Sequence, residues 1–263
     1  MGAGEVRRSI TGIALLSAGL GIALLAGCTL KKGQASPGQA ARWPLADARQ
    51  ESKPAKRGKK LFDQTPRFAR SYVGNQLACG DCHLNSGKGD YAAPMIDVAG
   101  LFPMFSKRAG HVITLEDRID ECFVRSEAGR PLPHSSEEMQ ALVAYIESLS
   151  TNQVHGQAYA KRGLVNLPAL QGNPQRGRFV YRQCSICHGD DGAGFPSAIP
   201  PLWGGGSFND GAGMNDPAKM AAYVYKNMPQ NSPGTLTAQD AWDVAMFIHQ
   251  KPHPKLNPDY ATF

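Results

Sequence analysis

The sequence predicts an all-α chain made of two tandem domains that repeat one design, and two observations carry that prediction. A pentapeptide of the form Cys-x-x-Cys-His occurs at residues 79–83 and again at 184–188, and a similar stretch precedes each copy, at 57–62 and 176–181. Apolar residues elsewhere recur at helical spacing, and no strand-like alternation of useful length is present. The chain is therefore expected to contain the same helical unit twice.

Each half is expected to open with a short amphipathic helix, which Pro66 interrupts in the first half. A loop rich in Gly and Pro follows each pentapeptide, at 87–103 and at 189–213. A capped helix then closes each half. The predicted capping pairs are Ser135 with Glu138, and Thr237 with Asp240.

The pentapeptide is the attachment site of a c-type haem, in which two thiols form thioethers to the porphyrin and the adjacent histidine binds the iron. A zinc site or a thioredoxin-like dithiol does not require a histidine after the second cysteine in both copies. The predicted attachment residues are Cys79, Cys82 and His83 for haem 1, and Cys184, Cys187 and His188 for haem 2. The order of helix, haem motif, loop and further helices is that of a class I cytochrome c fold. We therefore predict two class I cytochrome c domains, each with one covalent haem c.

The sixth ligand of haem 2 is expected to be Met228. It lies in an Asn-Met-Pro sequence 40 residues after His188 and just before the terminal helix, and a thioether there gives His/Met ligation. The competing methionines are Met214, Met220 and Met246.

Cys122 occupies the corresponding place in the first half, 39 residues after His83. Four cysteines are assigned to haem and Cys28 is expected to be acylated, so Cys122 has no intramolecular disulfide partner in an oxidising compartment. We expect it to bind haem 1 as a thiolate, although a small buried apolar role is also open. The alternative ligands are His111, Met95 and Met104.

Residues 114–126 have the pattern of a helix with one chemically distinctive face. That face contains, at helical spacing, Arg118, Cys122, Arg125 and Ser126. Arg108 lies shortly before, and Ile119 and Phe123 beside the face are expected to pack on the porphyrin. Neighbouring cations favour a thiolate, and guanidinium groups can bind a small oxyanion bidentately. The alternatives for the arginines are a solvated face or clamps for the haem propionates.

These segments together resemble the di-haem thiosulfate dehydrogenases from about residue 56 to 250. The matching segments are 74–79, 93–95, 118–126 and 132–133 in the first half, and 200–204, 209–214 and 227–229 in the second. One departure is Phe102-Pro103-Met104-Phe105, where relatives tend to carry tyrosines.

The resemblance implies that two thiosulfate ions are joined into tetrathionate at haem 1, between His83 and Cys122, with Cys122 leaving the iron to carry a sulfur-bound adduct. Arg108, Arg118 and Ser126 match the substrate-pocket positions of the family. Haem 2 would pass electrons to an external cytochrome or other acceptor. Asn227 stands where some relatives have Lys before the ligating Met, so a static His/Met haem is expected.

The direction of the reaction stays open, since some relatives work better as tetrathionate reductases. Two other functions also remain open: a non-catalytic di-haem electron carrier, and a thiosulfate-conjugating subunit of a sulfur-oxidation complex. A carrier predicts that thiosulfate leaves both irons unaffected, and a subunit predicts no activity without its partner.

The N-terminus predicts export and lipid anchoring. Arg7 and Arg8 precede a short apolar run that ends in Leu-Ala-Gly-Cys28, which resembles a bacterial lipobox; an ordinary signal peptide or an uncleaved anchor is the alternative. We expect a periplasmic, lipid-anchored protein, with the outer membrane slightly favoured. Nucleic acid is an unlikely partner there, although the chain carries a net charge of +6. The expected parts are a signal peptide (1–27), a tether (28–55), the haem 1 domain (56–150), a linker (151–171) and the haem 2 domain (172–263).

Overall fold

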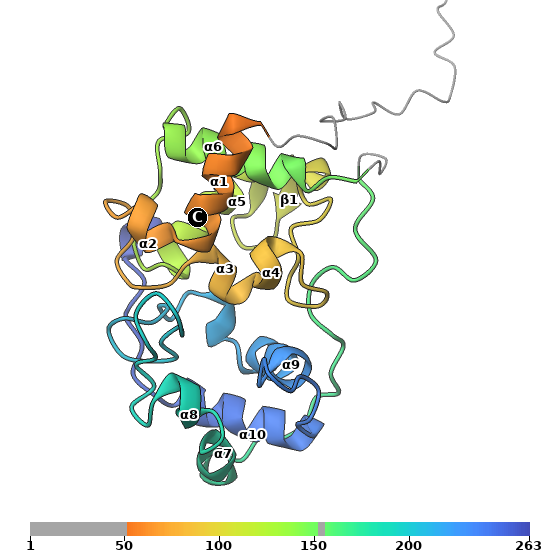
Figure 1. Cartoon of the computed structure of the whole chain (residues 1–263), viewed down its shortest axis with the longest axis vertical. Coiled ribbons are helices and arrows are strands. Elements are labelled where there is room, and N and C mark those ends of the chain that lie inside the picture. The colour runs from red at the N-terminus through yellow and green to blue at the C-terminus, as the bar shows by residue number, and fades with distance from the viewer. Residues whose placement is uncertain (1–51, 152–155) are drawn as a thin grey trace, which may run out of the picture. The chain divides into compact units, whose positions relative to one another are not determined.

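The computed structural model describes residues 52–151 and 156–263, which belong to one compact unit. The predicted signal peptide 1–27, the acylation site Cys28 and nearly all of the tether 28–55 lie outside the described residues. Helices are the main regular secondary structure of the described part (Figure 1). Among them, none is both long and apolar enough to cross a membrane.

Three helices of eleven or twelve residues form the frame of the first half: α1 (Lys53–Asp63), α5 (Leu115–Arg125) and α6 (Glu137–Ser148). The shorter elements are α2 (Thr65–Phe68), α3 (Cys79–Cys82), α4 (Leu84–Gly87) and the 3₁₀ helix η1 (Ala99–Leu101). The predicted interruption at Pro66 is confirmed, because α1 ends at Asp63 and α2 begins at Thr65 with proline in its first turn.

The second half repeats this frame with α7 (Pro174–Tyr181), α8 (Ser185–His188), α9 (Pro217–Asn227) and α10 (Ala238–His249). Two 3₁₀ helices complete it, η2 (Gly213–Asn215) and η3 (Pro258–Tyr260). The repeated Arg-Gly dipeptide has a physical cause. A Cβ on Gly58 would lie 1.9 Å from the carbonyl oxygen of Ala141, and one on Gly177 would lie 2.0 Å from that of Asp243. Only glycine permits the opening helix of each half to cross the closing helix so closely.

A short antiparallel hairpin interrupts the helical plan in the first half. Strands β1 (Met104–Ser106) and β2 (His111–Ile113) pair with Met104 opposite Ile113. The expectation of an all-α chain is therefore wrong in this one detail. Three-residue strands are too short to show an alternating pattern, which is why the sequence did not reveal them.

The helix caps agree with prediction except in one place. The hydroxyl of Thr237 accepts from the amide of Asp240, as expected. The first closing helix is capped by Ser136, whose hydroxyl accepts from the amide of Met139 at 3.2 Å, so the predicted box of Ser135 and Glu138 is wrong by one residue. Glu138 instead accepts from Arg57 on α1 at 3.1 Å.

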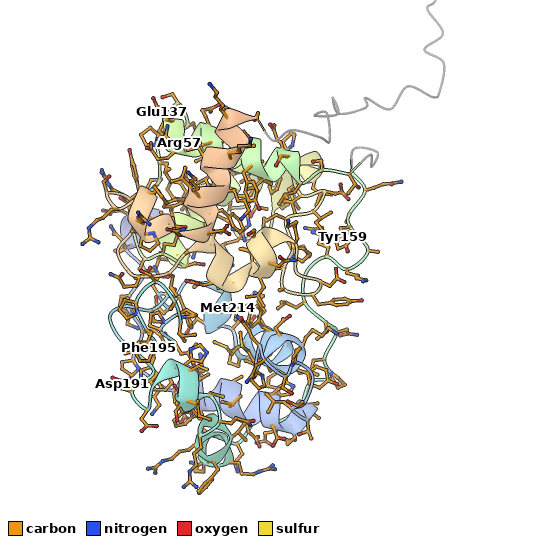
Figure 2. All side chains as sticks on the ribbon, in the orientation of Figure 1. Arg57, Glu137, Tyr159, Asp191, Phe195 and Met214 are labelled. Carbon is orange, nitrogen blue, oxygen red and sulfur yellow. The ribbon has the colours of Figure 1, made fainter. Side chains whose placement is uncertain are left out.

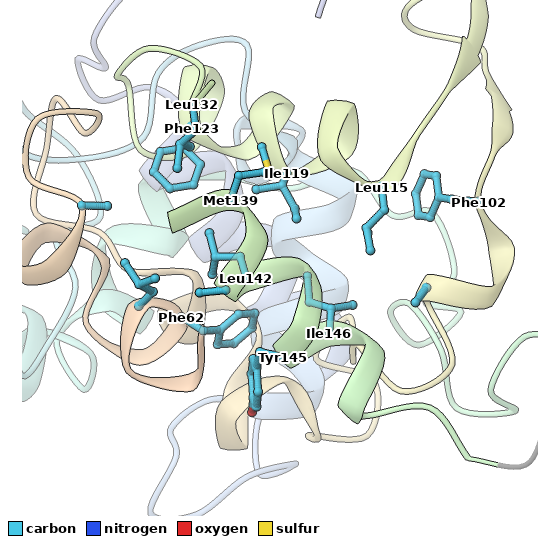
Figure 3. Packing of buried hydrophobic residues seen from close by; sticks show 14 of the residues in the cluster. Phe62, Phe102, Leu115, Ile119, Phe123, Leu132, Met139, Leu142, Tyr145 and Ile146 are labelled. Atoms are coloured by element: carbon cyan, nitrogen blue, oxygen red, sulfur yellow. The ribbon is translucent and has the colours of Figure 1, made fainter. Parts of the chain in front are cut away.

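The core of the first half lies between α1, α5 and α6 (Figure 3). Phe123 and Met139 are fully buried in it, and Phe62 meets Tyr145 edge to face with ring centroids 5.5 Å apart. This packing holds α5 in place, and α5 is the helix that contains Cys122.

Candidate active site

A cavity of about 580 Å³ opens in the first half and contains most of the predicted site. Helices α3, α5 and α6, the hairpin and the loop after the first haem motif all contribute to its wall. The predicted site residues that line it are Cys79, Cys82, His83, Arg108, Arg118, Cys122 and Ser126. Segments about forty residues apart in sequence thus converge on one space.

His83 is held in one tautomer. Its Nδ1 lies 2.6 Å from the carbonyl oxygen of Ala93, which can only accept, so Nδ1 carries the proton and Nε2 keeps a free lone pair. Burial lowers the pKa of His83 to about 4, so the imidazole is neutral at physiological pH. A neutral ring with an oriented Nε2 is the form that binds a metal.

The thiols and the cavity wall fit a covalent haem. Cys79 and Cys82 lie on α3 as free thiols and face the cavity beside His83. Apolar side chains from α1, α5, α6, β2 and the loops around α3 and η1 supply much of the remaining wall: Phe62, Leu77, Val98, Phe102, Ile113, Leu115, Ile119, Leu142 and Ile146. An apolar wall with two thiols and one oriented imidazole suits a porphyrin attached through thioethers.

Cys122 faces a cluster of charges. Nη1 of Arg118, one helical turn earlier, donates to Cys122 Sγ at 3.2 Å. Glu121 draws both arginines together, with its Oε2 lying 3.3 Å from Nη1 of Arg118 and 3.8 Å from Nη1 of Arg108. The electrostatic interaction with Cys122, the largest cause, raises the pKa of the Arg118 guanidinium. One guanidinium therefore contacts the sulfur of Cys122, and Glu121 holds a second one, that of Arg108, in the same cavity.

Two residues predicted for this face lie elsewhere. Arg125 is buried away from the cavity and donates to the carbonyl oxygens of Gly211 at 3.3 Å and Ala261 at 3.0 Å. Phe123 points into the core and does not line the cavity, whereas Ile119 does. Helical spacing places Arg125 and Phe123 near the edge of this face. At such positions the packing of neighbouring elements determines where a side chain points.

Of the three alternative ligands for haem 1, two line the cavity and one does not. Met95 and Met104 line the cavity together with Cys122. His111 is exposed on β2 and is not among the lining residues; its Nδ1 lies 3.0 Å from the carbonyl oxygen of Val112.

Several charged residues of the cavity were missed from the sequence. Glu121 is 5% exposed and Glu127 1% exposed, and Lys107 and Arg162 add two cations to the wall. Burial raises the pKa of Glu127 to about 8. Glu121 was within reach of prediction, because it adjoins Cys122 and lies three residues after Arg118. Arg162 was not, since it comes from the segment between the two halves.

The second half repeats the arrangement around His188. Its Nδ1 lies 2.9 Å from the carbonyl oxygen of Pro200, so Nε2 is again the free nitrogen, and burial lowers the pKa of the ring. Cys184, the N-cap of α8, and Cys187, within α8, are free thiols, which fits a second attachment site. Met228 follows α9 directly and packs against the second core, as does Met214 in η2. The remaining competitors, Met220 and Met246, lie within helices α9 and α10.

Known proteins show the same organisation. A sequence model described as the SoxA/TsdA cytochrome c domain matches residues 58–154, and one described as subunit III of cbb3-type cytochrome c oxidase matches residues 172–248. The thiosulfate dehydrogenase of Allochromatium vinosum is 39% identical over 210 residues, which cover 75% of this chain and 77% of the relative. That of Stutzerimonas stutzeri is 36% identical over 205 residues, covering 75% and 67%.

A solved structure agrees with these relatives. The thiosulfate dehydrogenase TsdBA from Marichromatium purpuratum superposes with a TM-score of 0.70 at 32% identity. The match covers 81% of this chain and 48% of the other, so the chain spans about half the length of that protein. The chain belongs to the thiosulfate dehydrogenase family and is built from two cytochrome c domains.

Proposed function

We propose that this chain, as a thiosulfate dehydrogenase, joins two thiosulfate ions into tetrathionate at the cavity of the first half and passes the two electrons through the second half to an external acceptor. The observation that carries the proposal is the position of Cys122. Its sulfur shares one cavity with His83 and the attachment thiols. The guanidinium of Arg118, a group that can also bind an oxyanion, donates a hydrogen bond to this sulfur.

Haem 1 would be attached through Cys79 and Cys82 and held between His83 and Cys122. Haem 2 would be attached through Cys184 and Cys187, with His188 and Met228 as ligands. When bound, each haem supplies a one-electron acceptor, and together the two accept the pair of electrons that one turnover releases.

The arginines bind and orient the substrate. Thiosulfate is a dianion, and the guanidinium groups of Arg108 and Arg118 offer paired donors beside Cys122. Ser126, one turn further along the same face, adds a hydroxyl to the cavity wall. Glu121 holds the two arginines in place and offsets part of their charge, so that the product dianion can leave.

Cys122 provides the nucleophile. Its thiolate forms a bond to the outer sulfur of the first thiosulfate, giving a Cys–S–S–SO₃⁻ adduct, and two electrons leave for the acceptor. The outer sulfur of the second thiosulfate then attacks the sulfur of that adduct. Tetrathionate departs and the thiolate of Cys122 is restored, with no proton taken up or released in the net reaction. The reverse sequence reduces tetrathionate.

The test is reduction of ferricyanide by thiosulfate with purified holoprotein, with tetrathionate quantified, compared with Cys122→Gly at equal haem content. We expect the wild type to form one tetrathionate for every two ferricyanides reduced, and the variant to lose that activity. Gln175→Gly, at an exposed position on α7 far from the cavity in sequence, controls for a general effect of a new glycine. If wild type is inert in both directions, the catalytic proposal fails, and an electron carrier or a partner-dependent subunit takes its place.

The proposed location is the periplasmic face of a bacterial membrane, with the chain anchored through an acylated Cys28. The lipobox sequence before Cys28 supports it. Mass spectrometry of the mature N-terminus tests it, since acylation adds the mass of fatty acyl chains and a free N-terminus elsewhere contradicts it.

A further inference from the structure

The first helix presents a face of unpaired lysines to solvent. Lys53, Lys56 and Lys60 recur at helical spacing on α1, all three are exposed, and no ion pair to them occurs among the described residues. With Leu61 and Phe68 they border a shallow groove of about 380 Å³. We call Lys53, Lys56, Lys60 and Phe68 the α1 basic face.

The acidic residues closest to this face are already paired. Arg57 forms ion pairs with Glu137 and Glu138 on α6, and Figure 2 shows Arg57 beside Glu137. Lys59 forms an ion pair with Asp63, with its Nζ 2.5 Å from Oδ2 of the carboxylate. The positive charge of the α1 basic face is therefore left for something outside the described residues.

The placement of Lys53 and Lys56 opposes the stability of the helix, whereas Lys60 lies in the last turn, where a cation is favourable. Lys53 is the first residue of α1, and the first turn contains no acidic residue. Positive charge at a helix N-terminus meets the positive end of the helix dipole, and Lys56 and Lys60 repel each other across one turn. Because Lys53 and Lys56 lower the stability of the helix, we expect their positive charge to serve binding.

The charge on either side of the face identifies the occupant. Residues 31–52, which precede α1, contain four Lys and Arg against two Asp and Glu, and residues 53–60 add five Lys and Arg and no acidic residue. The sequence before α1 therefore has a net charge of +2 and offers the face no complementary charge. A second copy of the same face would be repelled. An extended negative surface attracts both the face and the segment before it.

Phe68, the last residue of α2, adds an exposed aromatic side chain to the same groove. Its ring is 41% exposed and the guanidinium of Arg67 lies over it at 5.3 Å. An exposed aromatic side chain among cations is the composition that rests in the headgroup region of a bilayer. The lysines could bind an acidic protein surface equally well. A bilayer, however, also explains why the excess of basic residues extends over residues 31–60, because all of them can lie close to one extended anionic surface.

We propose that the α1 basic face is a docking surface for anionic phospholipid headgroups, which lays the first domain against the membrane. This contact does not depend on acylation of Cys28 or on the catalytic reaction. It would orient the domain with respect to the bilayer, whereas an anchor at the end of a tether would leave the domain free to turn.

The test is co-sedimentation of holoprotein carrying Cys28→Ser, which removes the acylation site, with vesicles of phosphatidylglycerol or of phosphatidylcholine. The charge-reversal variant is Lys53→Glu, Lys56→Glu, Lys60→Glu. Glutamate at positions 53 and 56, in the first turn of α1, is favourable, and position 60 is exposed, so this variant is expected to fold. The matched control reverses three exposed cations elsewhere: Lys88→Glu, Arg178→Glu and Arg182→Glu.

Each basic residue close to an anionic bilayer strengthens partitioning roughly fivefold, so loss of three predicts about a hundredfold weaker binding to phosphatidylglycerol. The control is expected to change binding by less than threefold, because its charges lie away from the contact and are screened by salt. Equal loss in both triple variants would overturn the proposal, since only net charge would then matter. Equal binding to phosphatidylcholine, or unchanged binding by the α1 variant, would overturn it as well. If the protein with an unchanged α1 basic face does not bind vesicles of either kind, the proposal is wrong, and an acidic protein becomes the expected partner of this face.

Discussion

Replacement of Arg118 by Met removes one guanidinium from the proposed substrate site and keeps most of the side chain's length. In the structure Nη1 of Arg118 lies 3.2 Å from Cys122 Sγ and 3.3 Å from Oε2 of Glu121. A hydrogen bond to a charged group contributes about 1.5–3 kcal/mol. The side chain of Arg118 is 42% exposed, so its pair with Glu121 belongs at the low end of that range. Together with one lost contact to the thiosulfate dianion, the barrier is expected to rise by about 2–4 kcal/mol, which lowers kcat/KM roughly 30- to 1000-fold.

Steady-state reduction of ferricyanide by thiosulfate measures this effect at equal haem content. Arg118→Lys keeps the charge without the planar fork, so an intermediate loss is expected. Arg130→Met is the matched control, because Arg130 is exposed, stacks over Tyr72 and does not line the cavity. A value of kcat/KM for Arg118→Met within threefold of the wild type would refute the assignment of Arg118 to substrate binding.

Three further predictions concern the second half, each measured as the free energy of unfolding of the holoprotein. Gly177→Ala places a methyl group 2.0 Å from the carbonyl oxygen of Asp243 and should destabilise the chain by about 3 kcal/mol; unchanged stability would contradict the close helix crossing. Asp243→Ala should cost about 1–3 kcal/mol, because it removes the buried oxygen that accepts from the amide of Asn173 at 2.7 Å; an effect below 0.5 kcal/mol, on the order of a surface substitution, would argue against that bond. The Leu256 amide and the Lys255 ammonium lower the pKa of Asp210, so its contribution is present above the ordinary aspartate pKa and lost as pH falls through the lower folded value. Asp210→Asn should therefore be less stable than wild type at pH 7 and equal to it in strong acid, and a difference that grew towards acid would have the wrong sign.

The parts of the fold that were predictable are those that a local pattern specifies. The haem motifs, the duplicated Arg-Gly dipeptide and the helix that begins at Thr114 each follow from a few neighbouring residues. The hairpin at 104–113 was not predictable in this way, because its strands are three residues long and its position depends on the cavity that it borders.

The candidate site was predictable along α5 but not across elements. Arg118, Cys122 and Ser126 share a helix face, so spacing alone grouped them. Arg125 satisfied the same spacing and yet turns to backbone carbonyls of the second half. Glu121 was overlooked because a carboxylate beside a proposed anion site looks unfavourable until its position between two arginines is known.

The side-chain amide of Asn227 makes one of the contacts that join the two halves. This amide donates to the carbonyl oxygen of Tyr91 in the first half at 3.2 Å and to that of Tyr223 at 3.0 Å. Asn209 makes a similar bond to the carbonyl oxygen of Val124 on α5 at 2.7 Å. A single side-chain amide that donates to a backbone carbonyl gives no periodic pattern in a sequence, so these contacts could not be predicted from it. Both asparagines lie close in sequence to the proposed sixth ligands or bond to a residue that does: Val124 is two residues after Cys122, and Asn227 directly precedes Met228. If Met228 binds haem 2, we expect Asn227, whose amide donates to two carbonyl oxygens, to position that ligand.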